Sequence, residues 1–158
     1  MRWLASPVLL VALAAMPPAL AAESPICRLF TQKEAAAHVG AAVADGEAGL
    51  VPGAQGCSWS DEATGNKLSI TVFPAGNALQ LKAWGFESWE GFRAVPGIGS
   101  RAYVARSPLM EIMGRTRGGE WQAGSVVGDD YLTVAVKGPK AGADAAIALL
   151  KEAIGRRR

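Results

Sequence analysis

The chain has 158 residues, of which 50% are hydrophobic and 19% are charged, and its formal net charge is +2. This length supports one domain with a hydrophobic core, and this composition excludes an intrinsically disordered chain. Because the net charge is small and the basic residues are scattered, apart from three arginines at the C-terminus, nothing indicates nucleic-acid binding.

The N-terminal segment has the pattern of an export signal. Arg2 gives a positive start, an apolar run covers residues 7–16, and the Ala-Leu-Ala at 19–21 is the small-x-small pattern that a signal peptidase cleaves. We therefore predict a signal peptide over residues 1–21 and a single domain over residues 22–158, soluble after cleavage and either periplasmic or secreted. No later stretch approaches the length of about 18 apolar residues that a membrane span needs, so we expect no stable membrane insertion.

Cys27 and Cys57 are the two cysteines of the chain. In an exported protein a pair of cysteines is most simply one disulfide, so we predict a Cys27–Cys57 bond. Lipidation of Cys27 is the first alternative, but Ser24, Pro25 and Ile26 separate it from the apolar run. A zinc site is disfavoured because the chain has one histidine, and a redox-active pair is disfavoured because there is no C-x-x-C motif.

The N-terminal half of the mature chain predicts a helix followed by a β-hairpin. Thr31 and Glu34 form a capping box ahead of an alanine run that ends at a glycine, which predicts a helix over 31–39. Residues 56–60 and 67–73 alternate apolar and polar side chains and have turn residues between them. We expect these two segments to pair as antiparallel strands.

The C-terminal half predicts a second helix over about 77–90, strands and a final helix. The strands are expected over 101–105, 109–116, 121–127 and 131–136, and the helix over 141–154. V-P-G occurs at 51–53 and again at 95–97, each time before a predicted strand, which suggests pseudo-duplicated αββ units. The predicted fold class is α+β, with an antiparallel sheet and helices packed on one face.

Several short motifs occur in a characteristic order. They are C-x-L-F-T-x-x-E from Cys27, C-x-W from Cys57 and V-P-G-I-G-x-x-A from Val95. With this order and spacing, the chain resembles a family of small exported bacterial domains of unknown function, many of which are actinobacterial lipoproteins. The resemblance implies the Cys27–Cys57 disulfide and a helix-flanked antiparallel sheet, and it implies no reaction. The chain departs from the family pattern in lacking a lipobox.

No assembled catalytic set is visible in the sequence. Serine and cysteine hydrolases normally need a histidine base. The one histidine, His38, falls in the last turn of a predicted helix, where a partly charged imidazole interacts favourably with the negative end of the helix dipole. The Gly-x-Gly at 97–99 leads into a predicted strand, whereas a dinucleotide loop opens a helix. Carboxylates alone can perform acid–base chemistry, and the candidates by residue type are Glu87, Glu90, Glu111, Glu120, Asp129 and Asp130. We therefore predict no catalytic residue, no cofactor and no metal site.

Four aromatic residues lie within nine positions, namely Trp84, Phe86, Trp89 and Phe92. Aromatic side chains dominate cores and interfaces, so some of the four are expected in the core. Their spacing of two, three and three residues does not fit one narrow helical stripe. We therefore treat them as candidate binding residues, any exposed member of which would suit a peptide, a glycan or a partner protein.

These observations favour an exported, non-enzymatic binding or accessory domain. It would act on an envelope protein or a small ligand through the open face of the sheet or through residues 84–92. The alternatives are a periplasmic immunity or inhibitor protein, a carboxylate-based hydrolase and a carrier of a hydrophobic ligand. A protruding loop would favour the inhibitor. Two acids that converge in one cleft would favour the hydrolase, and an apolar cavity between helix and sheet would favour the carrier.

Overall fold

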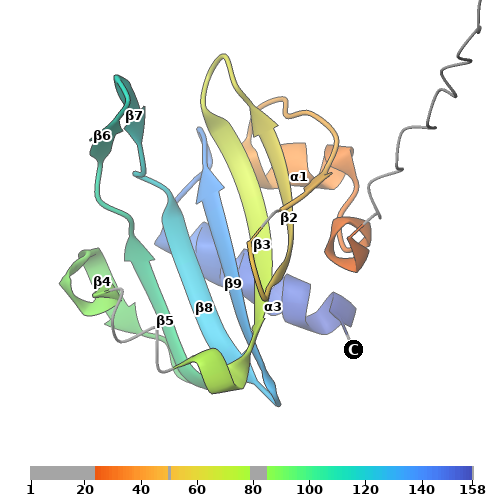
Figure 1. Ribbon diagram of the computed structural model, residues 1–158, viewed down its shortest axis with the longest axis vertical. Coiled ribbons are helices and arrows are strands. Elements are labelled where there is room, and N and C mark those ends of the chain that lie inside the picture. Colours follow the sequence, from red (N-terminus) through yellow and green to blue (C-terminus); the bar gives the residue numbers. More distant parts are fainter. Residues whose placement is uncertain (1–23, 50, 79–84, 158) are drawn as a thin grey trace, which may run out of the picture.

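The computed structural model describes residues 24–49, 51–78 and 85–157, so the predicted signal peptide lies outside the described residues. The described part of the chain contains two α-helices, nine β-strands and three short 3₁₀ helices, the first of which precedes α1 (Figure 1). In chain order the elements are η1 (Pro25–Arg28), α1 (Gln32–Val39), β1 (Glu47–Ala48), β2 (Gln55–Asp61), β3 (Asn66–Pro74), η2 (Ala75–Ala78), η3 (Phe86–Ser88), β4 (Glu90–Ala94), β5 (Ser100–Arg106), β6 (Met110–Ile112), β7 (Arg115–Arg117), β8 (Trp121–Val127), β9 (Asp130–Lys137) and α3 (Ala143–Arg157).

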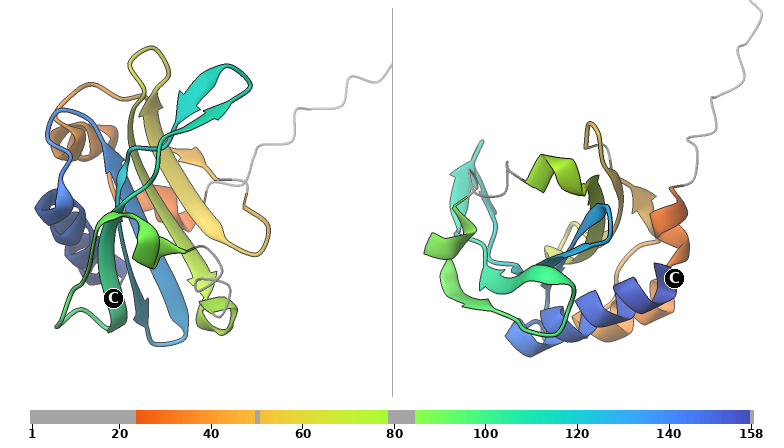
Figure 2. Two further views of the ribbon diagram at one scale, coloured as in Figure 1. Left: turned by 90° about the vertical axis from the view of Figure 1, so that its left-hand side faces the viewer. Right: turned by 90° about the horizontal axis from the view of Figure 1, so that it is seen from below.

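Seven of the strands form one antiparallel sheet in the order β1-β2-β3-β9-β8-β5-β4, and β6 pairs with β7 in a separate hairpin. Helices α1 and α3 lie side by side along one face of the sheet (Figure 2). The hairpin stands away from this layer (Figures 1 and 2). The predicted fold class, an antiparallel sheet with helices packed on one face, is confirmed.

The main core lies between the sheet and the two helices. On β3 the alternating residues Leu68, Ile70 and Val72 are buried, and each pairs in register with a buried aliphatic residue of β9. Because successive side chains of a strand point to opposite faces, this alternation fills one face with apolar side chains. α3 contributes Leu149 and Leu150 to the same core, and both are fully buried. The opposite face is left to other residues, which form the candidate site described below.

The N-terminal helix and the disulfide follow the sequence prediction. The Thr31 hydroxyl accepts a hydrogen bond from the Glu34 amide, while the Thr31 amide donates to the Glu34 carboxylate at 2.8 Å, so the capping box is complete. Gly40 ends α1 in the left-handed conformation, with φ 80°, which glycine adopts at little cost. The sulfur atoms of Cys27 and Cys57 lie 2.05 Å apart, which joins the segment before α1 to β2.

Two predicted elements were wrong in part. The helix expected over 77–90 does not reach its predicted end, because Gly85 is left-handed at φ 64° and residues 86–88 form a 3₁₀ turn. β4 then begins at Glu90. Residues 79–84 of the expected helix lie outside the described part of the chain. The strand expected over 109–116 is a hairpin, because Met113 and Gly114 both have positive φ and reverse the chain. The predicted repeat of an αββ unit stays a prediction, since its second helix falls partly on residues not described.

The disulfide is expected to contribute a large part of the stability. It closes a loop with a sequence separation of 30 residues, and restricting an unfolded loop of this size stabilises the fold by about 3–4 kcal/mol. Urea unfolding of the protein without residues 1–21 should therefore show a free energy of unfolding lower by about this amount after reduction. The double variant Cys27→Ser/Cys57→Ser is the control, because reductant should leave its stability unchanged. Equal stability of the wild type with and without reductant would contradict the assignment.

Candidate binding site on the open face of the sheet

The sheet face turned away from α1 and α3 is organised in rows that run across the strands. At one end of β3 and β9, Phe73 pairs in register with Tyr131. At the other end, Lys67 pairs with Lys137. Between the ends lie small polar residues, such as Ser69. Since cross-strand partners share a face, this face changes from aromatic at one end to charged at the other.

The aromatic end is a second, smaller core. Phe86 of η3 is buried and stacks on Tyr103 of β5 with ring centroids 5.0 Å apart. Trp89 meets Phe86 edge to face at 4.6 Å, and Phe92 stacks on Tyr103 at 6.1 Å while 36% of its surface remains exposed. Of the four aromatic residues predicted as a binding segment, Phe86 is therefore a core residue and Phe92 the most exposed of the described three, while Trp84 lies outside the described residues. A binding role for these residues stays a prediction.

Two tyrosines are joined beneath this aromatic cover. The hydroxyl groups of Tyr103 and Tyr131 lie 3.0 Å apart in a hydrogen bond, and the Gln122 amide donates to the Tyr103 hydroxyl at 3.1 Å. Burial penalises the phenolate and raises the pKa of Tyr103 to about 12. Burial also raises the pKa of Tyr131, and its neighbour Tyr103 adds to the effect. Both phenols therefore stay neutral hydrogen-bonding groups at physiological pH.

The charged end forms a groove. A cavity of about 620 Å³ lies between the turn that joins β2 to β3, the open face and the β6–β7 hairpin. Its basic residues are Lys67, Lys137, Arg115 and Arg117, and it also contains serine hydroxyls of β2. The Lys137 ammonium donates to the Gly118 carbonyl oxygen at 3.0 Å. The groove thus presents cations from two separate parts of the fold to the same space.

Three carboxylates also line the groove, and two of them are engaged by neighbours. Asp61 accepts hydrogen bonds from the Thr64 hydroxyl at 2.6 Å and from the Ala63 amide at 3.0 Å, and the Thr64 hydrogen bond is the main cause of its lowered pKa. Glu120 accepts from the Ser107 hydroxyl at 2.6 Å. The third is Glu62, which is exposed in the turn. Uncharged donors leave Asp61 and Glu120 negative, so three carboxylates face four cations and the groove keeps a small excess of positive charge.

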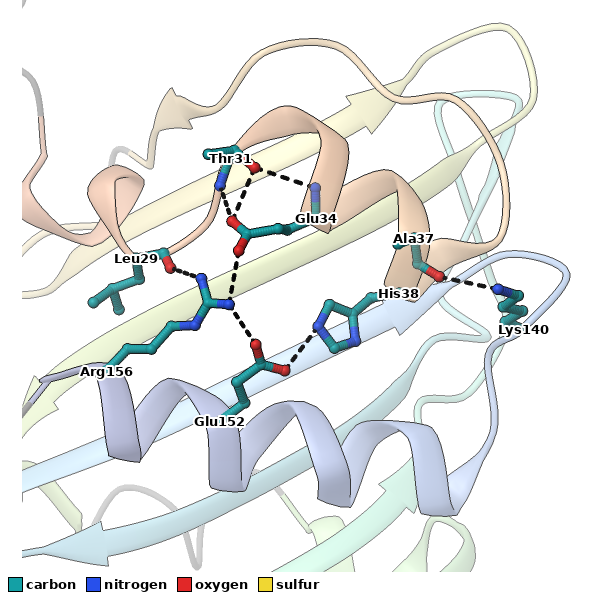
Figure 3. A network of polar contacts seen from close by, with 8 residues as sticks. All are labelled: Leu29, Thr31, Glu34, Ala37, His38, Lys140, Glu152 and Arg156. Carbon is teal, nitrogen blue, oxygen red and sulfur yellow. Dashed lines mark hydrogen bonds and ion pairs between the residues drawn. The ribbon is translucent and has the colours of Figure 1, made fainter.

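His38 belongs to a network on the opposite, helix-covered side of the protein (Figure 3). Its Nε2 atom lies 3.0 Å from the Glu152 carboxylate of α3. Arg156 bridges Glu152 at 2.6 Å and Glu34 at 2.8 Å, and its guanidinium lies 4.3 Å from the centroid of the Phe30 ring. The network ties α1 to α3, and the His38 ring also meets the Phe30 ring edge to face, with centroids 5.5 Å apart, so His38 joins elements on the helix-covered side.

The six carboxylates named as acid–base candidates are distributed over several elements. Four of them have polar partners: Glu90 pairs with Arg106, Asp130 pairs with Arg157, Glu120 binds Ser107 and Glu111 binds Thr116. Within residues 24–49, 51–78 and 85–157, no group of three or more histidine, cysteine, aspartate or glutamate side chains could hold a metal ion. In the same ranges, no helix combines the length and apolar character needed to cross a membrane.

The lysine pair was missed in the sequence, although both strands were predicted. Lys67 begins the predicted strand 67–73, and Lys137 directly follows the predicted strand 131–136. Their proximity depends on the pairing of β3 with β9, which brings together two lysines that lie 70 positions apart in the sequence. A comparison with protein-family models, with curated proteins and with solved structures finds no match.

The buried tyrosine pair predicts an unusual alkaline titration. Tyr103 and Tyr131 are the only tyrosines of the chain, so absorbance at tyrosinate wavelengths reports on them alone. The folded protein should show almost no tyrosinate at a pH of about 10–11, whereas the chain unfolded in guanidinium should titrate near about 10. Native titration near the pH of the unfolded chain would contradict the buried pair.

The helix network predicts an acid-sensitive part of the stability. A hydrogen bond from Arg156, followed by those from Thr31, lowers the pKa of Glu34 from 4.5 to about 2. A carboxylate with a lowered pKa stabilises the fold above its unfolded pKa and loses this contribution as the pH falls towards its folded pKa. Between pH 4.5 and about 2, urea unfolding should therefore show a steeper loss of stability for the wild type than for Glu34→Gln. Arg156→Gln should flatten the profile in the same way, and parallel profiles for all three proteins would argue against this assignment.

Proposed function

We propose that the protein is an exported, non-enzymatic accessory domain of the cell envelope that binds a carboxylate-bearing ligand in the groove at the charged end of the open face. The ligand is either an acidic segment of an envelope protein or a small acid, which offer the same chemistry to the groove. The predicted export signal and the resemblance to small exported bacterial domains support the location.

The lysine pair is the observation that carries this proposal. Lys67 and Lys137 are direct cross-strand partners, and like charges in this arrangement destabilise a sheet. Natural proteins tolerate such local costs mainly at functional sites. An anionic group bound between the two ammonium groups would remove the repulsion, so ligand binding would relieve a destabilising interaction of the free protein.

The surroundings of the pair fit an anionic ligand. Arg115 and Arg117 reach the same cavity from the hairpin, and arginine can bind a carboxylate through two parallel hydrogen bonds. The serine hydroxyls of β2 add uncharged donors. The volume of about 620 Å³ falls within the range of typical ligand sites, about 300–1,000 Å³.

A fluorescent glutamate-rich peptide is a direct probe of the groove. The mature protein should bind it, and Lys67→Gln/Lys137→Gln should weaken binding by at least about tenfold, because charge-assisted contacts are removed. Raising the salt concentration should weaken binding as well.

The matched control is Lys33→Gln/Lys151→Gln. It makes the same change in net charge at exposed positions of α1 and α3, on the other side of the sheet, and should bind the peptide like the wild type. The proposal would be contradicted if the wild type did not bind the peptide, or if both double variants bound it equally weakly.

A further inference from the structure

The β6–β7 hairpin is the most exposed part of the described chain that carries large apolar side chains. All ten residues from Pro108 to Arg117 are exposed. Four of them are apolar and keep much of their surface in contact with solvent: Leu109 66%, Met110 52%, Ile112 48% and Met113 96%. Exposed apolar groups gathered on one projection mark an interaction surface more often than single scattered ones do.

The two faces of the hairpin differ in chemistry. Met110 pairs with Arg117, and Ile112 pairs with Arg115, so these four side chains share one face. Glu111 pairs with Thr116 on the other face, where the Thr116 hydroxyl donates to the Glu111 carboxylate. The first face therefore combines apolar and cationic side chains, and the one carboxylate of the hairpin lies on the other.

The tip of the hairpin is built by an uncommon backbone conformation. Met113 and Gly114 are both left-handed, with φ values of 52° and 72°, as the two central residues of a type I′ turn are. Glycine and asparagine are the usual residues in this conformation, and a methionine there costs conformational energy. This turn places Met113 at the apex with 96% of its surface exposed.

The base of the hairpin is fixed to the sheet. The Ser107 amide donates to the Glu120 carbonyl at 2.9 Å, and the Gly119 amide donates to the Ser107 carbonyl at 3.0 Å. Gly118 has φ 90°, and a Cβ atom there would lie 1.9 Å from the Pro108 carbonyl oxygen, so only glycine fits. These contacts hold the arm at a defined position relative to the sheet.

We propose that the hairpin is a docking arm for an anionic membrane surface. Met113 and Ile112 would enter the boundary between headgroups and acyl chains, and Arg115 and Arg117 would bind the anionic headgroups behind them. Three residues per strand at about 3.3 Å each give an arm of about 10 Å, which matches the depth of about 5–10 Å to which interfacial segments enter a bilayer. The contact is reversible and does not span the membrane.

A protein partner is the other occupant that such an arm could have, and the size of the arm favours lipid. A stable protein interface takes about 20–30 residues from each side, whereas the exposed run has ten residues. Interfacial binding to lipid needs only a few apolar side chains together with basic ones. The cationic face of the hairpin is complementary to phosphate headgroups.

Vesicle sedimentation tests the proposal. The mature protein should sediment with vesicles of phosphatidylcholine mixed with phosphatidylglycerol, bind less to phosphatidylcholine alone, and dissociate as salt is raised. Ile112→Ser/Met113→Ser and Arg115→Gln/Arg117→Gln should each weaken binding by about tenfold or more. Lys33→Gln/Lys151→Gln is the control for the second pair, because it removes the same charge elsewhere and should bind normally. All of these positions except Lys33 and Lys151 lie on the arm, and circular dichroism should show an unchanged fold in every variant.

Three results would overturn the proposal. The first is a wild type that does not bind the anionic vesicles. The second is a serine variant that binds them as well as the wild type does, since the apolar tip would then contribute nothing to vesicle binding. The third is equal weakening by the arginine and lysine pairs, which would mean that net charge alone drives binding. Arg115 and Arg117 also line the groove, whereas Ile112 and Met113 do not, so the serine variant is the one that separates this proposal from the function proposed above.

Discussion

The two described helices cover the same face of a seven-stranded sheet, and the remaining features depend on this one-sided arrangement. Strand alternation sends Leu68, Ile70 and Val72 towards the helices and the residues between them to the opposite face. That opposite face has three zones: aromatic rings close one end, small polar residues occupy the middle, and cations gather at the other end. The chemistry available to a ligand is therefore concentrated at the charged end, beside the β6–β7 hairpin.

The helix-covered side supplies a firm support for this face. The disulfide joins the chain before α1 to β2, and Arg156 ties Glu34 of α1 to Glu152 of α3 (Figure 3). Sites built on strands that are fixed from behind hold their side chains more accurately than sites on loops. The groove combines both kinds of support, since two of its cations stand on central strands and two stand on an arm with a fixed base.

Local signals in the sequence predicted much of the fold. The capping box at Thr31 and Glu34 predicted α1 to within one residue, and the strand expected over 121–127 coincides with β8. The hairpin of β2 and β3 was also predicted, because its strands are neighbours in the chain and their turn carries its own residues.

Features that depend on tertiary structure were not predicted. The neighbourhood of Lys67 and Lys137 requires the non-local pairing of β3 with β9. The burial of Phe86 requires Tyr103 and Tyr131 beneath it, and both belong to later strands. The turn at Met113 and Gly114 was overlooked because methionine rarely adopts the left-handed conformation, so residues 109–116 were expected to form one continuous strand.

The repulsion between Lys67 and Lys137 is the central claim, and a double-mutant cycle measured by urea unfolding tests it most directly. Lys67→Gln should raise the free energy of unfolding by about 0.2–1 kcal/mol, because a like-charge cross-strand pair is removed. The gain should disappear in the Lys137→Gln background and shrink at high salt. A loss of stability on Lys67→Gln, or an equal gain in both backgrounds, would show that the two lysines do not repel each other and would contradict this account of the groove.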